Sequence, residues 1–306
     1  MKRILLIAVA ALAIVACKKD KDEPQQPAPQ PAPAPAQPSA DQGSIPTTVD
    51  FKYPKTLVIT SESAGRPAQV RTITYTVDSA KKLLTKAEFS DRGTYVFEYD
   101  AKNFLTKAKG DTFTYDFTYN DKGVITKIAI SGNQTGTYEY THNAEGKLTK
   151  TAYNGLINMG PGQAPQPDVY EYTYDYSVAN KIAVTHKEEG TPTRTYTYTF
   201  DTNKNVVELE GTDIGKSTYE NYDNKFNLHS KSPFSYLDDY GNFSVYGEKD
   251  RLVTSPNNVG KKTNRTIYET ATSDYTYQYD GNVVKKSVEV QKNGFGTTTI
   301  TTVYNY

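Results

Sequence analysis

Three features of the sequence predict an all-β fold, a long antiparallel meander of tyrosine-rich hairpins rolled into a barrel-like or strongly curved sheet. Aromatic residues alternate with other side chains along many short stretches, as in Tyr95-Val96-Phe97-Glu98-Tyr99. A similar unit recurs about every 20 residues, and clusters of Asp, Asn, Lys and Gly separate the stretches. Alternation with a period of two is typical of half-buried strands, and such clusters are typical of tight turns.

The repeated unit predicts a β-hairpin. One strand ends in an aromatic or aliphatic residue followed by Asp or Asn, and the next begins with Leu or Ile followed by Thr-Lys. In the fourth unit, Tyr140 and Asn143 take these places. We expect the Tyr and Phe side to face inward and the Thr and Lys side to face water. Strands of about 6–8 residues with polar outer positions are predicted not to cross a membrane as a barrel. The Leu or Ile positions lie 21, 20 and 23 residues apart, at Leu84, Leu105, Ile125 and Leu148.

The N-terminus predicts where in the cell the protein is located. Lys2 and Arg3 precede an uncharged apolar run, residues 4–16, that ends directly before Cys17, the one cysteine of the chain. This run is shorter than the roughly 20 residues that span a bilayer, and it suits a secretory signal. The sequence Ile14-Val15-Ala16-Cys17 resembles the lipobox of bacterial lipoproteins, which implies cleavage after residue 16 and a lipid anchor on Cys17. A cysteine that falls by chance in a signal or short membrane segment is the other interpretation.

The next residues predict a tether. Residues 18–23, Lys-Lys-Asp-Lys-Asp-Glu, resemble the surface-export signal of Bacteroidetes lipoproteins, which implies the outer face of the outer membrane. The alternative interpretation is that these residues are a solvated spacer and that the protein lies on the periplasmic leaflet. Residues 24–46 are rich in Pro and Ala and favour an extended rod. The predicted division is 1–16 signal peptide, 17–46 lipidated cysteine and Pro/Ala-rich tether, and 47–306 a single β domain.

Charge and motif content exclude several function classes. Without Lys2 and Arg3, the chain keeps 33 basic and 35 acidic residues and shows no basic stripe, so we expect no nucleic-acid partner. A single cysteine excludes an intramolecular disulfide and a cysteine-based metal site. The sequence contains no Gly-x-Ser-x-Gly, phosphate-binding loop or dinucleotide fingerprint. We therefore predict no catalytic residues, no metal and no cofactor.

Two further patterns are interpreted as structural. His142, His186 and His229 share no metal-ligand spacing and are predicted to lie at the surface. The stretch Asp201-x-Asn203-x-Asn205 matches the first positions of a calcium loop but lacks its glycine and its final glutamate, so a hairpin turn is predicted. Asp238-Asp239, near Asn242, is an equally weak match.

Two segments, residues 154–168 and 232–262, break the alternation. Irregular parts of a regular scaffold often carry function. The second segment contains aromatic residues without clean alternation, and rings of this kind can stack against sugars. The alternative is that these rings close one end of the rolled sheet. Our predicted ligand-binding platform consists of Tyr236, Tyr240, Phe243 and Tyr246.

The pattern Tyr-Asp-x-x-Gly-x-Leu resembles, in degenerate form, the YD repeats of Rhs-type proteins. The whole layout, from lipobox and Pro-rich tether to the C-terminal YTYQYDGNVVKK and TTTITTVYNY, is similar to a Bacteroidetes surface lipoprotein family of unknown function with a porin-like β fold. The resemblance implies a curved antiparallel sheet and supplies no catalytic residues. We expect a non-catalytic protein of the outer membrane surface, held by its lipid, that binds a glycan, a peptide or an envelope partner. A purely structural or adhesion component is the alternative, and a glycan hydrolase ranks third.

Overall fold

The computed structural model describes residues 53–91, 93–158, 160, 162–225, 227, 255–266 and 269–306, all within one compact unit, Gln37–Tyr306. These residues form strands and turns without a helix, so none of the described part offers a helix long and apolar enough to cross a membrane. The strands are β1 (Thr56–Ser63), β2 (Gln69–Asp78), β3 (Leu83–Phe89), β4 (Gly93–Tyr99), β5 (Leu105–Lys109), β6 (Phe113–Tyr119), β7 (Ile125–Gly132), β8 (Thr135–His142), β9 (Leu148–Ile157), β10 (Gln166–Asp175), β11 (Lys181–Glu188), β12 (Arg194–Phe200), β13 (Val206–Gly211), β14 (Gly215–Glu220), β15 (Lys261–Arg265), β16 (Thr270–Asp280), β17 (Val283–Asn293) and β18 (Gly296–Asn305).

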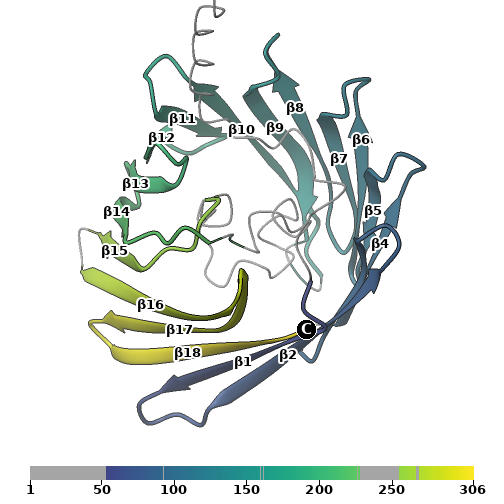
Figure 1. Cartoon of the computed structure of the whole chain (residues 1–306). Coiled ribbons are helices and arrows are strands. Elements are labelled where there is room, and N and C mark those ends of the chain that lie inside the picture. Colours follow the sequence, from purple (N-terminus) through teal and green to yellow (C-terminus); the bar gives the residue numbers. More distant parts are fainter. Residues whose placement is uncertain are drawn as a thin grey trace, which may run out of the picture. The chain divides into compact units, whose positions relative to one another are not determined.

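The strands close into one antiparallel barrel. Each strand pairs with its neighbours in sequence, and β1 also pairs with β18 through eight residue pairs, from Thr56↔Asn305 to Ser63↔Thr298 (Figure 1). Closure leaves none of the described strands with an unpaired edge. The predicted meander is therefore confirmed, and of the two predicted shapes the structure has the barrel. Strand lengths run from 5 to 11 residues, a wider range than expected.

The inner face of the barrel is the aromatic one. The Tyr277 hydroxyl donates to the Val259 carbonyl at 3.0 Å, and Val259 belongs to a segment that runs inside the ring of strands in Figure 1. Strand pairing extends this face around the wall to Tyr95 and Phe97 of β4 and to Tyr115 of β6, all buried. The predicted inward orientation of the Tyr and Phe side is thus confirmed.

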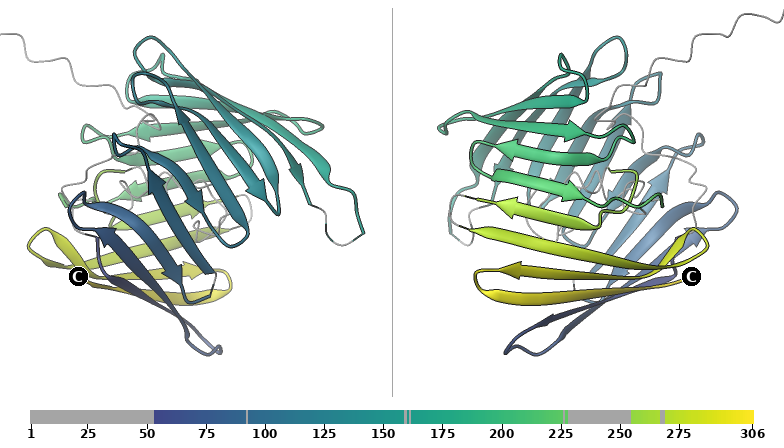
Figure 2. Two further views of the ribbon diagram at one scale, coloured as in Figure 1. Left: turned by 90° about the vertical axis from the view of Figure 1, so that its right-hand side faces the viewer. Right: turned by 60° about the vertical axis from the view of Figure 1, so that its left-hand side comes forward.

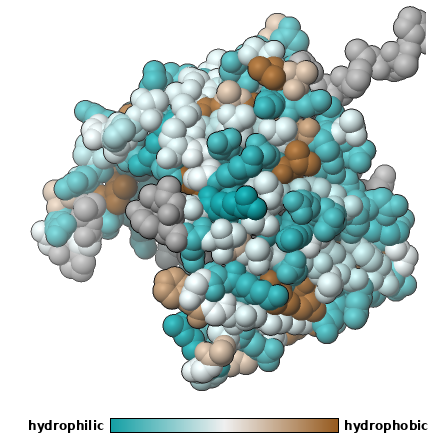
Figure 3. All heavy atoms as spheres, turned by 90° about the vertical axis from the view of Figure 1, so that its left-hand side faces the viewer, coloured by the Kyte–Doolittle hydropathy of each residue, from teal (hydrophilic) through white to brown (hydrophobic). Residues whose placement is uncertain are grey.

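The outer face is polar. Alternate positions carry Thr, Lys and Glu, and oppositely charged side chains pair across neighbouring strands. The ammonium of Lys107 lies 3.2 Å from a carboxylate oxygen of Asp116, and that of Lys150 lies 2.6 Å from Glu171. Such exposed pairs contribute about 0–1 kcal/mol each. Figure 3 shows the hydrophilic character of one side of this face, with apolar residues scattered over it.

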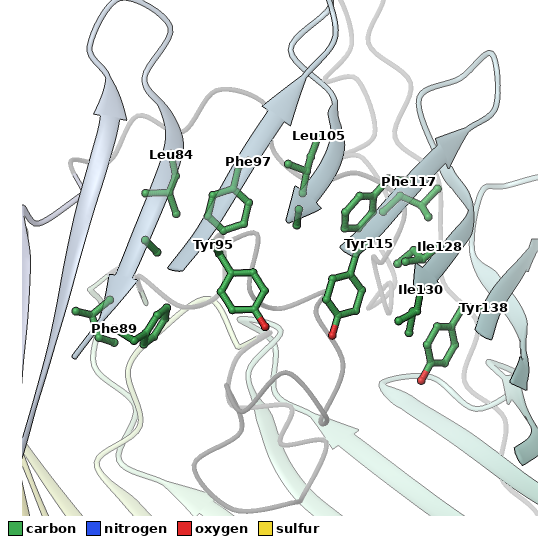
Figure 4. Packing of buried hydrophobic residues seen from close by; sticks show 14 of the residues in the cluster. Leu84, Phe89, Tyr95, Phe97, Leu105, Tyr115, Phe117, Ile128, Ile130 and Tyr138 are labelled. Atoms are coloured by element: carbon green, nitrogen blue, oxygen red, sulfur yellow. The ribbon is translucent and has the colours of Figure 1, made fainter. Parts of the chain in front are cut away.

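Two hydrophobic clusters line the inner wall. The larger follows β1–β9 and joins residues of β17 and β18, and Figure 4 shows labelled members of it along one face of β3–β8. The smaller follows β11–β14 and includes Val259. Tyr115, Tyr153 and Tyr219 are among the largest fully buried side chains. Each such ring removes roughly 150–250 Å² from water, so tyrosine supplies much of the core.

Hairpin turns stand at both ends of the barrel (Figure 2). At one end the turns have a common design, in which an Asp or Asn side chain accepts backbone hydrogen bonds and a residue with positive φ reverses the chain. Asp100 accepts from the N–H groups of Lys102 and Phe104, both at 2.8 Å, and Asn103 has φ 66°. We call this end the Asp/Asn rim, defined by Asp78, Asp100, Asn120, Asn143, Asp175, Asp201 and Asp280.

A second contact recurs in several units and ties a hairpin to the one before it. The Tyr99 hydroxyl donates to the Leu84 carbonyl, and the Tyr119 hydroxyl to the Leu105 carbonyl, both at 2.8 Å. A register shift lies directly before each of these tyrosines. The bulge turns the tyrosine ring so that it lies along the wall. The tyrosine hydroxyl then donates a hydrogen bond to a backbone carbonyl of the preceding unit.

The fourth unit corrects one assignment. Its register shift lies between Thr141 and His142, and His142 pairs with Leu148 as Tyr119 pairs with Ile125. His142 therefore occupies the position that holds tyrosine in the two preceding units. The repeat pattern predicted Tyr140 for this position, and that assignment is wrong.

Candidate functional site

The predicted platform, Tyr236, Tyr240, Phe243 and Tyr246, lies outside the described residues, as do Cys17, Asp238, Asp239 and His229. The residues on either side of the platform segment are described, and both are fixed to the barrel. Asp223 accepts hydrogen bonds from the backbone N–H of Lys225 at 2.9 Å and of Asn258 at 3.1 Å, and from the Tyr279 hydroxyl. These contacts join the two ends of the segment to β16.

The hairpin turn after β12 contacts the described residues that follow the platform segment. Asn205 donates from its side-chain amide to the Asn257 side chain and accepts from the Asn257 backbone, both at 3.1 Å. The Asp201 carboxylate accepts the Asn205 N–H at 2.9 Å, so the predicted hairpin turn at this calcium-like stretch is confirmed. Among the residues with described positions, no three His, Cys, Asp or Glu side chains are placed to hold a metal ion.

The inner wall carries a continuous series of rings, the ring ladder, formed by Tyr138, Tyr153, Tyr170, Tyr172 and His186 on β8–β11. Ring centroids lie 4.5 Å apart between Tyr138 and Tyr153 and 4.8 Å apart between Tyr153 and Tyr170. The Tyr172 and His186 rings stack at 4.4 Å with planes 8° apart. Tyr138 and Tyr170 also share a hydroxyl–hydroxyl bond of 2.7 Å. The ladder is thus a rigid aromatic strip across four strands.

Two facing glycines leave room for the ladder. Gly136 and Gly155 are paired across β8 and β9, and the Tyr153 ring lies over them. A Cβ added to Gly136 would lie 2.6 Å from the ring's Cζ, and one added to Gly155 would lie 2.7 Å from the Thr135 carbonyl oxygen. The ring can therefore lie flat against the wall only because both positions lack a side chain.

One of the predicted surface histidines, His186, is buried. His186 is only 5% exposed, because it occupies an inner-face position of β11 two residues after the buried Val184. His142 is half-buried at the end of β8. The surface assignment is therefore wrong for His186, whose place follows from strand alternation alone.

Tyrosines also gather where the barrel closes, in the seam cluster of Tyr53, Tyr75, Tyr99, Tyr277 and Tyr304. Burial raises the pKa of every one of these phenols, and neighbouring phenols raise the pKa of Tyr53, Tyr75 and Tyr277 further. Phenols with such raised pKa values stay neutral at neutral pH. Their hydroxyls serve the fold, since that of Tyr99 donates to the Leu84 carbonyl and that of Tyr277 to the Val259 carbonyl.

Comparison with known proteins identifies similar solved structures but no family. No family model and no curated protein matches the chain. Among solved structures, it is similar to a porin-like protein from Bacteroides uniformis, at 20% identity and TM-score 0.43, over 82% of this chain and 96% of that one. A porin-like protein from Bacteroides vulgatus gives 14% identity and TM-score 0.42, over 83% and 99%. A TcdB2–TccC3 chain gives 12% and 0.36, over 77% of this chain and 13% of that one. The barrel assignment therefore rests on the strand pairing of this chain.

Proposed function

We propose that this protein is a non-catalytic, lipid-anchored component of the outer membrane surface whose barrel binds an extended ligand, a glycan or a peptide. Basic residues, an uncharged apolar run and Cys17 follow one another in the order of a lipoprotein signal. The Pro/Ala-rich residues 24–46 would hold the barrel away from the lipid surface. The anchor, rather than the strands, would attach the protein to the membrane.

The outer face supports this role for the anchor. A transmembrane barrel turns an apolar band to lipid, and a Lys or Arg on that band costs about 2–4 kcal/mol near the bilayer midplane. Here the outward positions hold charged pairs such as Lys107–Asp116 and Lys216–Glu208. This distribution of polarity is the opposite of the one that lipid requires and suits a barrel surrounded by water.

The observation that carries the binding role is the aromatic inner wall. Tyr170 and Tyr172 of the ring ladder are half-buried, and together with the half-buried Tyr174 and Tyr196 they turn rings and hydroxyls toward the enclosed side. Flat rings beside hydroxyl and amide groups suit sugar rings and peptide side chains, because each ligand unit has an apolar face and polar edges. The described residues that flank the platform of residues 236–246 contact this same side, so the platform stays part of the proposal.

The proposal is tested with the mature full-length protein in detergent, probed with oligosaccharide and peptide arrays. Tyr172→Leu removes a half-buried ladder ring, whereas Thr173→Ala alters the neighbouring outward position of β10. We expect an array hit whose affinity falls at least tenfold in the first variant and is unchanged in the second. An affinity loss of equal size in both variants, or no hit at all, would favour the purely structural component.

A further inference from the structure

A cleft of about 420 Å³ opens at the Asp/Asn rim, between the turn that joins β6 to β7 and the turn that joins β8 to β9. It lies at the rim end of the inner wall, where the Tyr140 ring stacks on Tyr138 of the ring ladder. Its lining includes Asn120, Asp121, Val124, Tyr140, His142 and Gly146. The repeated design of the rim shows why a space exists here, because the neighbouring pair of turns has the same backbone with different side chains.

In the neighbouring pair, large rings fill the equivalent space. Phe104, the fifth residue of the turn that starts at Asp100, stacks on Tyr119 with ring centroids 5.0 Å apart and planes 27° apart. The Phe104 ring also covers Gly123, where an added Cβ would lie 2.5 Å from its Cζ atom. A ring on each side therefore closes this gap.

At the cleft both of these positions carry smaller side chains. Val124 is equivalent to Phe104, because its carbonyl accepts the Asn120 N–H at 2.9 Å just as the Phe104 carbonyl accepts the Asp100 N–H at 2.9 Å. His142 is equivalent to Tyr119 by its register shift and pairing.

Gly146 provides an independent measure of the space. It holds the place of Gly123, since each glycine N–H donates to the carbonyl of the capping Asn three residues earlier, at 3.0 and 2.9 Å. Nothing lies within 4 Å of a Cβ added to Gly146, whereas Phe104 occupies that place at Gly123. The space between these turns is therefore open. It arises because Val124 stands where the neighbouring unit has Phe104, and His142 stands where that unit has Tyr119.

The lining of the cleft is that of a small amphipathic site. Val124 and the half-buried ring of Tyr140 give it an apolar part, and the imidazole of His142 lies beside them. The exposed carboxylate of Asp121 and the exposed ammonium of Lys122 stand at its edge, so acceptors and donors are both present without a strong excess of either charge.

We infer that this cleft binds one pyranose unit of a glycan. A pyranose has an apolar C–H face, which suits Val124 and Tyr140, and a girdle of hydroxyls that need both acceptors and donors, which Asp121 and Lys122 provide. The Asp121 carboxylate would repel a strongly anionic ligand. A purely apolar ligand would give no hydrogen-bond partners to Asp121 and Lys122. The inference concerns a second site, at the rim end of the inner wall, and it does not depend on a ligand at Tyr170 or Tyr172.

The test uses the mature full-length protein in detergent and the methyl glycosides of glucose, galactose, mannose and N-acetylglucosamine. Saturation-transfer difference NMR detects contact, and titration gives the affinity, which we expect near 1 mM for a single sugar. His142→Tyr and Val124→Phe install the side chains of the neighbouring unit and should each reduce affinity at least tenfold. Together the two substitutions recreate the packing of Phe104 on Tyr119, so the thermal midpoint of the double variant should not fall.

Two further variants keep the result interpretable. Asp121→Ala changes an exposed turn residue without filling the cleft, and it should weaken binding severalfold while leaving the fold intact. Val96→Phe adds a ring at an exposed outer position of β4, and it should bind like the unchanged protein. Absence of saturation transfer from all four glycosides overturns the inference, and so does full binding by the folded His142→Tyr and Val124→Phe variants. Tyr172→Leu should leave this binding intact, so failure at the inner wall and failure at the cleft are distinguishable.

Discussion

The buried tyrosines predict a steep loss of stability in alkali. Burial raises the pKa of all five phenols of the seam cluster above the usual value of about 10. Burial also raises the pKa of Tyr196 and of Tyr306 to about 12. Below about pH 10 these phenols are protonated in both the folded and the unfolded chain, and their contribution to stability is fully present. Above that pH the unfolded chain releases protons that the folded chain retains, so the free energy of unfolding falls as pH rises.

The magnitude follows from the five seam phenols alone. Each contributes a slope of about 1.4 kcal/mol per pH unit while its unfolded form is ionised and its folded form is not, so five together give about 7 kcal/mol per unit. A domain is typically stable by about 5–15 kcal/mol. The barrel should therefore unfold cooperatively within about one to two pH units above pH 10, and the more exposed Tyr196 and Tyr306 add a smaller share because water screens them.

The assay follows tyrosinate absorption and far-UV circular dichroism together during a titration with base. We expect tyrosinate to appear late and in one step that coincides with loss of the β signal, whereas the protein in guanidinium chloride should titrate gradually near pH 10. Tyr304→Phe removes one of the five groups and should lower the slope of stability against pH by about one fifth. Gradual ionisation near pH 10 with an intact β signal would refute the reasoning, because it would mean that water reaches the seam phenols.

Three further changes have distinct expected outcomes. Gly155→Ala places a methyl group against the Tyr153 ring and the Thr135 carbonyl, and it should cost about 2–3 kcal/mol in urea unfolding, whereas a cost near zero would show that the ring is not held flat. Tyr119→Phe removes the 2.8 Å bond to a backbone carbonyl and should cost about 1 kcal/mol; an unchanged midpoint would contradict a stabilising role. Cys17→Ser should move the protein from the membrane fraction to the soluble fraction, and persistent membrane association would end the lipid-anchor proposal.

Local features of the fold could be predicted from the sequence, because they depend on neighbouring residues. The alternation Tyr95-Val96-Phe97 places two rings on one face, and Phe97 is 4% exposed whereas Val96 is 41% exposed. The turn beginning at Asn120 follows from a capping side chain and a glycine with positive φ. Closure of the barrel has no local signal, because it joins Thr56 to Asn305 across nearly the whole chain.

The candidate sites were less predictable for the same reason. The rim cleft depends on Val124 meeting His142 across two hairpins, and only the register shift before His142 shows that it replaces a tyrosine. Period-two alternation along β11 could have placed His186 on the inner wall, since Val184 and Ile182 share its face. The surface prediction for the histidines rested on metal-ligand spacing, and such spacing carries no information about the face of a strand.

The antiparallel contact between β1 and β18 limits how this architecture can change in size. Successive strands run in opposite directions, so only an even number of strands lets the first and last meet antiparallel. A single added strand would force that junction to be parallel, whereas a whole hairpin preserves it. Growth or shrinkage by one repeat would thus alter the circumference by about 9–10 Å, two inter-strand spacings. The repeat of about 20 residues is the smallest segment that duplication or deletion can add or remove while the ring stays sealed.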